Sequence, residues 1–256
     1  MIYRGRKLRN MVHKLYNKDG LELLSEIPDK SVDLVLTDPP YITSRSSGMQ
    51  SLFSDPTKSS EKYGRMYAIK TDYGEWDRNF TLDELGKYVT EFYRVLKDGG
   101  TSIIFFDIWK ITQLSDMYNE NKFKQVRLIE WLKTNPVPIN AKVNYLSNAR
   151  EIAVSAIKKS KPTFNSYYDK GVYEYPIYSG KDRFHPTQKS LKLFEDLIMK
   201  HSNENDVVLD CFMGSGTTVI ACANTTRKCI GSEINEEYYT KVLARVESNS
   251  LEKFFI

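Results

Sequence analysis

The residues Asp38-Pro39-Pro40-Tyr41 bring together groups that could bind and orient an amine. The prolines restrict the backbone, so that a main-chain carbonyl and the Asp38 carboxylate can converge as two hydrogen-bond acceptors. Two acceptors suit an exocyclic amine, which carries two N–H donors, and Tyr41 adds a flat face on which a base can stack. A simple proline turn capped by Asp38 would use the same four residues.

A second run of residues could hold a nucleoside. Gly214-Ser215-Gly216 joins a strand-like segment, 206–210, to a helix that begins at Thr217. Glycine lets a backbone approach a ligand closely, and Glu233, at the end of the next strand, is placed to accept both ribose hydroxyls. Val219 stands where the dinucleotide fingerprint has its third glycine. The pattern therefore favours an adenosine-type ligand without a pyrophosphate, although such a turn can also serve helix–strand packing alone.

The elements that must position these residues are those of an α/β protein. Apolar and β-branched runs predict strands at 32–36, 101–106, 126–132, 152–157, 206–210 and 229–233. One helix is predicted to begin at Thr81, with Glu84 completing a capping box, and to end at Asp98-Gly99-Gly100; another follows Asn235. A strand, glycine loop, helix and strand in succession indicate a mainly parallel sheet with helices on both faces. Both runs then lie at carboxyl ends of strands, where such sheets bind ligands.

The charge of the chain is unevenly distributed. The net charge is +4, but residues 121–192 hold 14 Lys/Arg against 5 Asp/Glu, and the remainder holds 23 against 28. A basic face of this kind suits a phosphate-backbone partner, although a solvated lysine-rich surface is equally compatible. The apolar runs are too short to cross a membrane, and three cysteines without a Cys-x-x-Cys pair give no disulfide framework. A cytoplasmic location is expected, and no metal site is predicted.

Taken together, the two runs resemble motifs of the DNA amino-methyltransferases, which transfer a methyl group from S-adenosylmethionine to an exocyclic base nitrogen. Asp38-Pro39-Pro40-Tyr41 resembles the catalytic motif in its adenine-N6 form, and residues 210–218 resemble the cofactor loop. The catalytic motif comes first by about 170 residues, an order similar to that of the permuted β group. The resemblance implies one Rossmann-like domain, residues 1–256, with a seven-stranded sheet and a small basic target-recognition insert.

The resemblance also assigns roles to single residues. It implies catalytic roles for Asp38, Pro39, Pro40 and Tyr41. It implies cofactor contacts from the segments 17–20 and 185–189 as well as from the glycine loop and Glu233. The predicted cofactor-binding residues are Asp19, His185, Thr187, Lys189, Asp210, Phe212, Gly214, Ser215, Gly216, Thr217, Thr218 and Glu233.

Double-stranded DNA is the expected partner. In the β group the target-recognition region lies between the two motifs, which here gives residues 135–184, within the basic stretch. The serine-rich segment 42–80 is predicted to be a flexible loop facing DNA, or else a surface insert. For the aromatic side chains between Phe164 and Tyr178 we favour packing over DNA contact. The predicted DNA-binding residues are Arg45, Lys158, Lys159, Lys161, Lys181 and Arg183.

The expected activity is site-specific methylation of adenine N6 by base flipping and direct transfer, within a restriction–modification system. Cytosine-N4 methylation is the nearest alternative, because it uses the same fold and geometry with a motif that commonly begins with serine. Cytosine-C5 chemistry is disfavoured because no cysteine follows a proline. RNA or protein methylation and a non-catalytic DNA-binding protein are less favoured. The recognition sequence, a cognate restriction endonuclease and a homodimer are left open.

Overall fold

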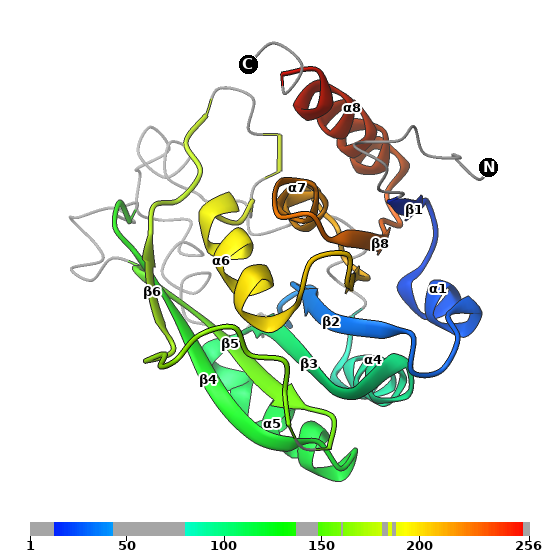
Figure 1. Ribbon diagram of the computed structural model, residues 1–256, viewed down its shortest axis with the longest axis vertical. Helices are drawn as coiled ribbons and strands as arrows, with labels where there is room; N and C mark the ends of the chain where they lie inside the picture. The colour runs from blue at the N-terminus through cyan, green and yellow to red at the C-terminus, as the bar shows by residue number, and fades with distance from the viewer. Residues whose placement is uncertain are drawn as a thin grey trace, which may run out of the picture.

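A computed structural model describes residues 13–42, 80–136, 148–159, 161–180, 184–185 and 188–252, with side chains up to Asn249 (Figure 1). Within these ranges one sheet has the strand order β1-β8-β7-β2-β3-β5-β4-β6. The predicted α/β architecture is confirmed, but the expected number of seven strands is wrong, since the sheet has eight. Its two edge strands have three and four residues, and neither contains the continuous apolar run on which the strand predictions rest.

Most neighbouring strands of the sheet run parallel. The exceptions are β5, which is antiparallel to both β3 and β4. The strands are β1 (Lys14–Tyr16), β2 (Val32–Thr37), β3 (Leu96–Phe106), β4 (Lys124–Lys133), β5 (Arg150–Ile157), β6 (Val172–Tyr175), β7 (Val207–Asp210) and β8 (Lys228–Ser232). Because β5 lies between β3 and β4, this part of the predicted target-recognition region belongs to the main sheet.

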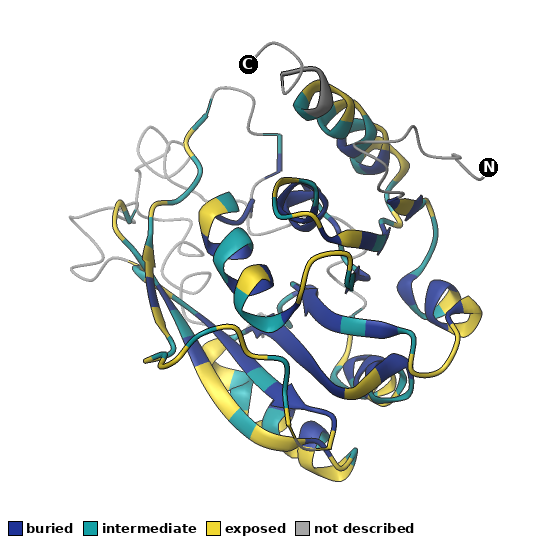
Figure 2. Ribbon diagram, viewed as in Figure 1, coloured by how far each residue is buried: buried dark blue, intermediate teal, exposed yellow. Residues whose placement is uncertain are grey.

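Helices cover both faces of the sheet (Figure 1). On one face lie α1 (Gly20–Glu26), α4 (Leu82–Val95) and α5 (Ile111–Glu120), and on the other α6 (Leu191–His201), α7 (Thr217–Asn224) and α8 (Glu236–Glu252). Side chains alternate along β2, so that Leu34 and Leu36 join the α6–α8 side and Val35 joins the α1–α5 side. Figure 2 shows this core as buried ribbon through the central strands, with exposed residues on β4 and the outer helices. Within the described ranges, none of the helices combines the length and apolar character that a bilayer crossing requires.

Helix α4 begins as predicted and ends earlier than predicted. The Thr81 side chain accepts a hydrogen bond from the Glu84 amide, and the Glu84 carboxylate accepts one from the Thr81 amide, which completes the capping box. The expected end at Asp98-Gly99-Gly100 is wrong, because β3 follows directly at Leu96 and runs through both glycines. Leu96 already pairs with Val32 of β2, so strand pairing takes over before the glycines are reached.

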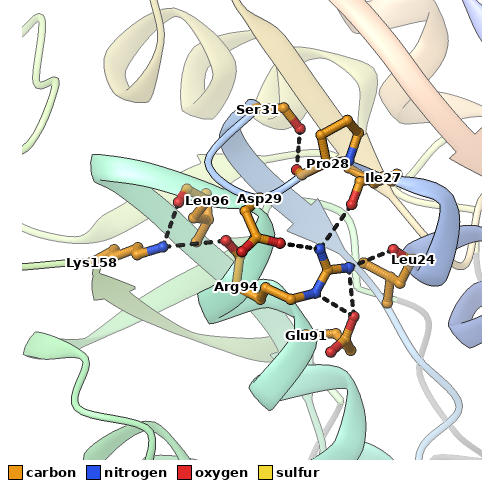
Figure 3. A network of polar contacts seen from close by, with 9 residues as sticks. All are labelled: Leu24, Ile27, Pro28, Asp29, Ser31, Glu91, Arg94, Leu96 and Lys158. Atoms are coloured by element: carbon orange, nitrogen blue, oxygen red, sulfur yellow. Dashed lines mark hydrogen bonds and ion pairs between the residues drawn. The ribbon is translucent and has the colours of Figure 1, made fainter.

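The last turn of α4 is fastened to the connection between α1 and β2 (Figure 3). The Arg94 guanidinium donates to the carbonyls of Leu24 and Ile27 at 2.6 and 2.8 Å. It also pairs with the carboxylates of Asp29 and Glu91 at 2.6 and 2.7 Å. These contacts fix the start of β2, the strand whose far end carries Asp38.

The chain leaves β7 and β2 in opposite directions. From β7 it passes through α7 to β8, which is the neighbour of β7 away from β2. From β2 it passes through α4 to β3, which is the neighbour of β2 away from β7. Because β7 and β2 are neighbouring parallel strands, their carboxyl ends flank the point where strand order reverses. Open α/β sheets bind ligands in the crevice at such a point.

Candidate active site

The two motifs predicted from sequence lie side by side at this point. The Thr37 hydroxyl, at the end of β2, donates a hydrogen bond to Asp210 Oδ1, at the end of β7, over 2.7 Å. Both residues are buried. The contact places Asp38 next to the glycine loop, although 173 positions separate its two partners in the sequence.

The Asp210 carboxylate accepts three hydrogen bonds, two of them from the glycine loop and the helix that follows it. Besides Thr37, its carboxylate accepts the Thr218 hydroxyl at 2.5 Å and the Phe212 amide at 3.1 Å. Burial raises the pKa of Asp210. The hydroxyls of Ser215 and Thr217 are likewise buried and lie 3.0 Å from each other. These four predicted cofactor-binding side chains therefore shape the loop from inside.

The glycine loop opens toward Glu233. Gly214 and Gly216 have φ values of +50° and +74°, a left-handed conformation that glycine adopts without steric cost. The Gly214 amide donates to Glu233 Oε2 at 2.8 Å, and the Asn235 amide donates to Oε1 at 2.9 Å. Each carboxylate oxygen keeps a second lone pair, so Glu233 can still accept a ligand hydroxyl on either oxygen. Burial raises the pKa of Glu233.

Three further predicted residues border the loop. The His185 ring lies against Gly214 and meets the Tyr238 ring edge-on at 4.7 Å. Phe212 lies 4.7 Å from the Tyr88 ring, measured between centroids. Asp19 caps α1, and Asn17 beside it donates to the Glu233 carbonyl at 2.7 Å, which brings the 17–20 segment to the same place. Thr187 lies outside the described residues.

Asp38 is the end of a chain of alternating charges. Its Oδ2 lies 2.9 Å from Lys189 Nζ, Lys189 Nζ lies 2.6 Å from Glu151, and Glu151 lies 2.7 Å from Lys133 Nζ. The four side chains are only 7–19% exposed. The structure thus places Lys189, predicted as a cofactor-binding residue, directly on the Asp38 carboxylate.

The other carboxylate oxygen of Asp38 is a buried acceptor. Among the described residues, no donor reaches Asp38 Oδ1. Burial raises the pKa of Asp38 to about 6, although the Lys189 charge opposes this rise. Tyr41, which follows the two buried prolines, turns its ring toward Phe106 in an edge contact at 6.0 Å. An acceptor that is buried and left unsatisfied is costly, so a ligand donor at this point would be bound favourably.

The predicted DNA-binding lysines do not gather here. The ammonium of Lys158 is buried and donates to the Leu96 carbonyl at 2.8 Å, so its prediction as a phosphate contact is wrong (Figure 3). Lys159 is exposed but pairs with Asp98 at 2.6 Å. Lys158, Lys159 and Lys161 follow β5, whose last residues pair with the start of β3, whereas Asp38 follows the end of β2, so these lysines lie toward the opposite ends of the strands from Asp38. Arg45, Lys181 and Arg183 lie outside the described residues.

The described residues cover only part of the predicted DNA-facing loop and of the predicted target-recognition region. Segment 43–79, the body of the predicted DNA-facing loop, lies outside the described residues, as do 137–147 of the predicted target-recognition region. In the described part of that region Tyr173 is buried, in keeping with packing, whereas Tyr167 and Tyr168 are exposed.

Sequence reasoning missed several residues of the site. Thr37 is the last residue of β2, Lys133 is the last residue of β4, and Glu151 is the second residue of β5. Thr37 carried a signal, since a polar residue just where a buried strand ends belongs to the ligand-binding edge. Glu151 joins this edge only because β5 runs antiparallel to β3, and strand direction and partner choice could not be read from the sequence.

Another missed feature is an exposed tryptophan in the turn that follows β3. The 3₁₀ turn η1 (Ile108–Lys110) follows β3, and its Trp109 side chain is 87% exposed. Asp107 caps the turn and pairs with Lys110 at 2.9 Å, while Lys110 also donates to the Ile42 carbonyl. The turn that carries the exposed Trp109 is therefore tied to the segment that carries Tyr41.

Comparison with known proteins agrees with this geometry. The family of DNA methylases known as N6_N4_Mtase matches residues 32–244, which span both motifs and every strand except β1. The chain belongs to this DNA methylase family. The predicted resemblance to DNA amino-methyltransferases is thereby confirmed, and S-adenosylmethionine is the cofactor, as predicted.

Relatives of the methylase are similar over most of their length. The type II methyltransferase M2.LlaDCHI of Lactococcus lactis subsp. cremoris is 29% identical over 88% of this chain and 85% of its own. The type II methyltransferase M2.DpnII of Streptococcus pneumoniae is 28% identical over 92% and 90%.

Two solved structures with the same fold are those of M1.HpyAVI and of the PvuII DNA methyltransferase. M1.HpyAVI, solved as a SAM complex, matches with a TM-score of 0.67 and 29% identity over 91% of this chain and 98% of its own. The cytosine-N4-specific PvuII DNA methyltransferase matches with a TM-score of 0.69 and 20% identity over 91% and 86%. The second likeness concerns the fold alone, so the fold of the methylase leaves the target base undecided.

Proposed function

We propose that this DNA methylase transfers a methyl group to the N6 amine of adenine in double-stranded DNA. The observation that carries the proposal is the buried Asp38 Oδ1, an acceptor without a partner among the described residues, beside the glycine loop. An exocyclic amine supplies the donor that this oxygen lacks. The motif begins with aspartate, which is the adenine-N6 form that the resemblance implies.

Asp38 acts on the amine through charge and direction. Lys189 occupies Oδ2, so the amine N–H is accepted by Oδ1, and the Pro39 carbonyl is the proposed acceptor for the second N–H. With both hydrogens held, the nitrogen lone pair has one direction left. The carboxylate charge favours the amine as positive charge develops on it, an effect strengthened where water is excluded.

The residues around the glycine loop fit the cofactor. Glu233 retains lone pairs for ribose hydroxyls, and the left-handed Gly214 presents backbone where a side chain would meet His185 at 3.3 Å. We therefore propose that Glu233, Asp19, Phe212 and the 214–216 backbone hold S-adenosylmethionine. When bound, it supplies a methyl group already activated on a sulfonium, so no covalent intermediate on the protein is required.

The position of Asp38 requires that the base leave the duplex. A buried acceptor cannot reach an amine inside stacked DNA, so we propose that the adenine is flipped and that Tyr41 stacks on it. Since relatives are named as type II methyltransferases, we further propose a role in restriction–modification. A cognate endonuclease, a homodimer and a cytoplasmic location remain predictions.

The test is methyl transfer from labelled S-adenosylmethionine to unmethylated duplex DNA, followed by nucleoside analysis. N6-methyladenine in the wild-type product, with no label for Asp38→Ala, is the expected result. Label in no base, under conditions where the cofactor binds, would overturn the proposal of DNA methylation.

Cytosine N4 is the second candidate substrate. The same acceptor suits either exocyclic amine, and the cytosine-N4-specific PvuII enzyme shares the fold. N4-methylcytosine in the same nucleoside analysis would keep the reaction and the role of Asp38 and replace the base.

A further inference from the structure

We propose that Lys189 is a positioning residue for Asp38, and that Glu151 and Lys133 hold it in that place. The inference rests on the proposed function, because it concerns the carboxylate that would accept the target amine. It gives Lys189 a role different from the cofactor contact expected from the sequence.

The four charged side chains come from four separate parts of the chain. Asp38 follows β2, Lys189 precedes α6, Glu151 stands at the start of β5 and Lys133 ends β4. Because β5 runs antiparallel to β3, its first residues lie at the same edge of the sheet as the carboxyl ends of β2 and β3. The reversed strand thus delivers a carboxylate behind the lysine, where a parallel strand would have begun at the opposite edge.

The ammonium of Lys189 has a determined position. Its nitrogen lies 2.9 Å from Asp38 Oδ2, 2.6 Å from Glu151 Oε2 and 3.4 Å from the Tyr41 hydroxyl oxygen. The same nitrogen lies 5.3 Å and 5.4 Å from the ring centroids of Tyr41 and Phe105. Since the side chain is 7% exposed, little water competes with these contacts. Lys189 therefore fixes Asp38 Oδ2 and leaves Oδ1 as the oxygen that meets the ligand.

The neighbouring charges favour the ionised forms of Lys189 and Glu151, although both side chains are buried. Burial alone lowers the pKa of Lys189, and the carboxylates of Asp38 and Glu151 more than reverse this. Burial raises the pKa of Glu151, yet Lys189 and Lys133 together hold it below its usual value. Removing one member of a buried pair leaves an uncompensated charge, so each partner supports the next.

Two substitutions should shift the pKa of Asp38 in opposite directions. The titratable and charged groups that act on Asp38 are Lys189, Glu151 and Tyr41. Lys189 favours the ionised carboxylate, so Lys189→Met should raise the pKa of Asp38. Glu151 opposes ionisation, so Glu151→Gln, which retains an acceptor for Lys189, should lower it.

The experiment is the pH dependence of single-turnover methyl transfer, with S-adenosylmethionine affinity measured on the same samples. Ionised Asp38 is required, so the wild-type rate should fall as pH drops through about 6. In Lys189→Met this acidic limb should move upward by about 1–3 pH units, since an adjacent opposite charge shifts a carboxyl pKa by about that much. The rate lost near neutral pH should be recovered at higher pH. Lys189→Arg retains the charge and should leave the limb nearly in place.

The outcomes separate this inference from the proposed function. Asp38→Ala alone decides whether Asp38 is needed for transfer. If it is needed but the limb is unmoved in Lys189→Met, the positioning role is wrong; if cofactor affinity falls instead, Lys189 is a cofactor ligand. Should Lys189→Met fail to fold, a downward shift in Glu151→Gln still supports the inference, and an upward or absent shift overturns it.

Discussion

Two parts of the candidate site are built on different plans: the residues around the glycine loop, called the nucleoside side after the ligand proposed for them, and the residues around Asp38, called the amine side for the same reason. Around the glycine loop, the buried hydroxyls and carboxylates are engaged with each other, and Asp210 alone accepts three hydrogen bonds. Around Asp38, charges alternate in sequence and one carboxylate oxygen is left without a partner among the described residues. The first plan gives a rigid shape to which a ligand adds contacts. The second stores an unmet acceptor for a ligand to satisfy. On the nucleoside side, the buried side chains hydrogen-bond to one another without a ligand. On the amine side, Asp38 Oδ1 has no donor among the described residues, so a ligand would have to supply one.

The largest expected effect comes from breaking the amine side. Asp38→Ala should lower the transfer rate by about 10²–10⁴-fold, the range typical of a lost acceptor or electrostatic group in the transition state. S-adenosylmethionine affinity should stay within about twofold, because Asp38 is proposed to contact the target amine and not the cofactor. Single-turnover kinetics and calorimetric binding measure the two quantities, and a loss of affinity equal to the loss of rate would contradict the division.

The link between the two halves can be broken next. Asp210→Ala removes the acceptor of two buried hydroxyls and a backbone amide, which should lower the free energy of unfolding by about 2–5 kcal/mol. Thr37→Val removes one donor to this carboxylate and should cost about 1.5–3 kcal/mol. Urea unfolding measures both. Equal stability of Asp210→Ala and wild type would show that the hydrogen bonds are not what holds the loop.

A ligand contact on the nucleoside side should have an effect on binding and not on the fold. Glu233→Gln should weaken S-adenosylmethionine binding by roughly 10–100-fold, since hydrogen bonds to a charged group contribute about 1.5–3 kcal/mol. Glu236→Gln, an exposed neighbour in the first turn of α8, is the matched control and should bind normally. Isothermal titration distinguishes them, and equal affinities would remove Glu233 from the cofactor site.

A smaller effect is expected at the rim of the amine side. Trp109 is exposed on a turn tied to the segment that carries Tyr41, where we propose that the flipped base enters, and stacking of an aromatic ring on a base contributes about 1–3 kcal/mol. Trp109→Ala should therefore weaken DNA binding by roughly fivefold or more, Trp109→Phe should retain most of the affinity, and cofactor binding should not change. Fluorescence anisotropy with a labelled duplex gives the DNA affinities; no loss in Trp109→Ala would exclude the contact.

The smallest effect belongs to the lysines that the charge count favoured. Lys159 is paired with Asp98 at the far edge of the sheet, so Lys159→Ala should change DNA affinity by less than about twofold and leave its salt dependence unaltered. A reduced slope of affinity against salt in this variant would return Lys159 to the DNA interface.

Local chemistry predicted most of the fold. The capping box at Thr81, the apolar and β-branched run along β2 and the glycine loop are short-range patterns, and each led to the correct element. The boundary between α4 and β3 was wrong because Leu96 joins the sheet through a partner, Val32, far away in the sequence. The edge strands β1 and β6 were not predicted, because Lys14-Leu15-Tyr16 and Val172-Tyr173-Glu174-Tyr175 lack the continuous apolar run that marked the four-residue β7.

The site divides in the same way. Asp38, the glycine loop and Glu233 could be chosen because each stands at the end of a predicted strand. The partners of the lysines could not be chosen, since a count of charges does not distinguish a surface from an interior. Lys133, Lys158 and Lys189 contributed to the basic stretch, yet the structure uses all three inside the molecule.

The contacts at the end of α4 have a consequence for how the molecule folds. The Arg94 carbonyl receives the amide of Lys30 and the ammonium of Lys158, while the Arg94 side chain reaches back to Leu24. Leu24 lies 70 positions before Arg94 in the sequence, and Lys158 lies 64 positions after it. The helix terminus is therefore completed only when an earlier loop and a later strand have both arrived. Hydrogen exchange should find this terminus opening together with the docking of β5, as one cooperative unit.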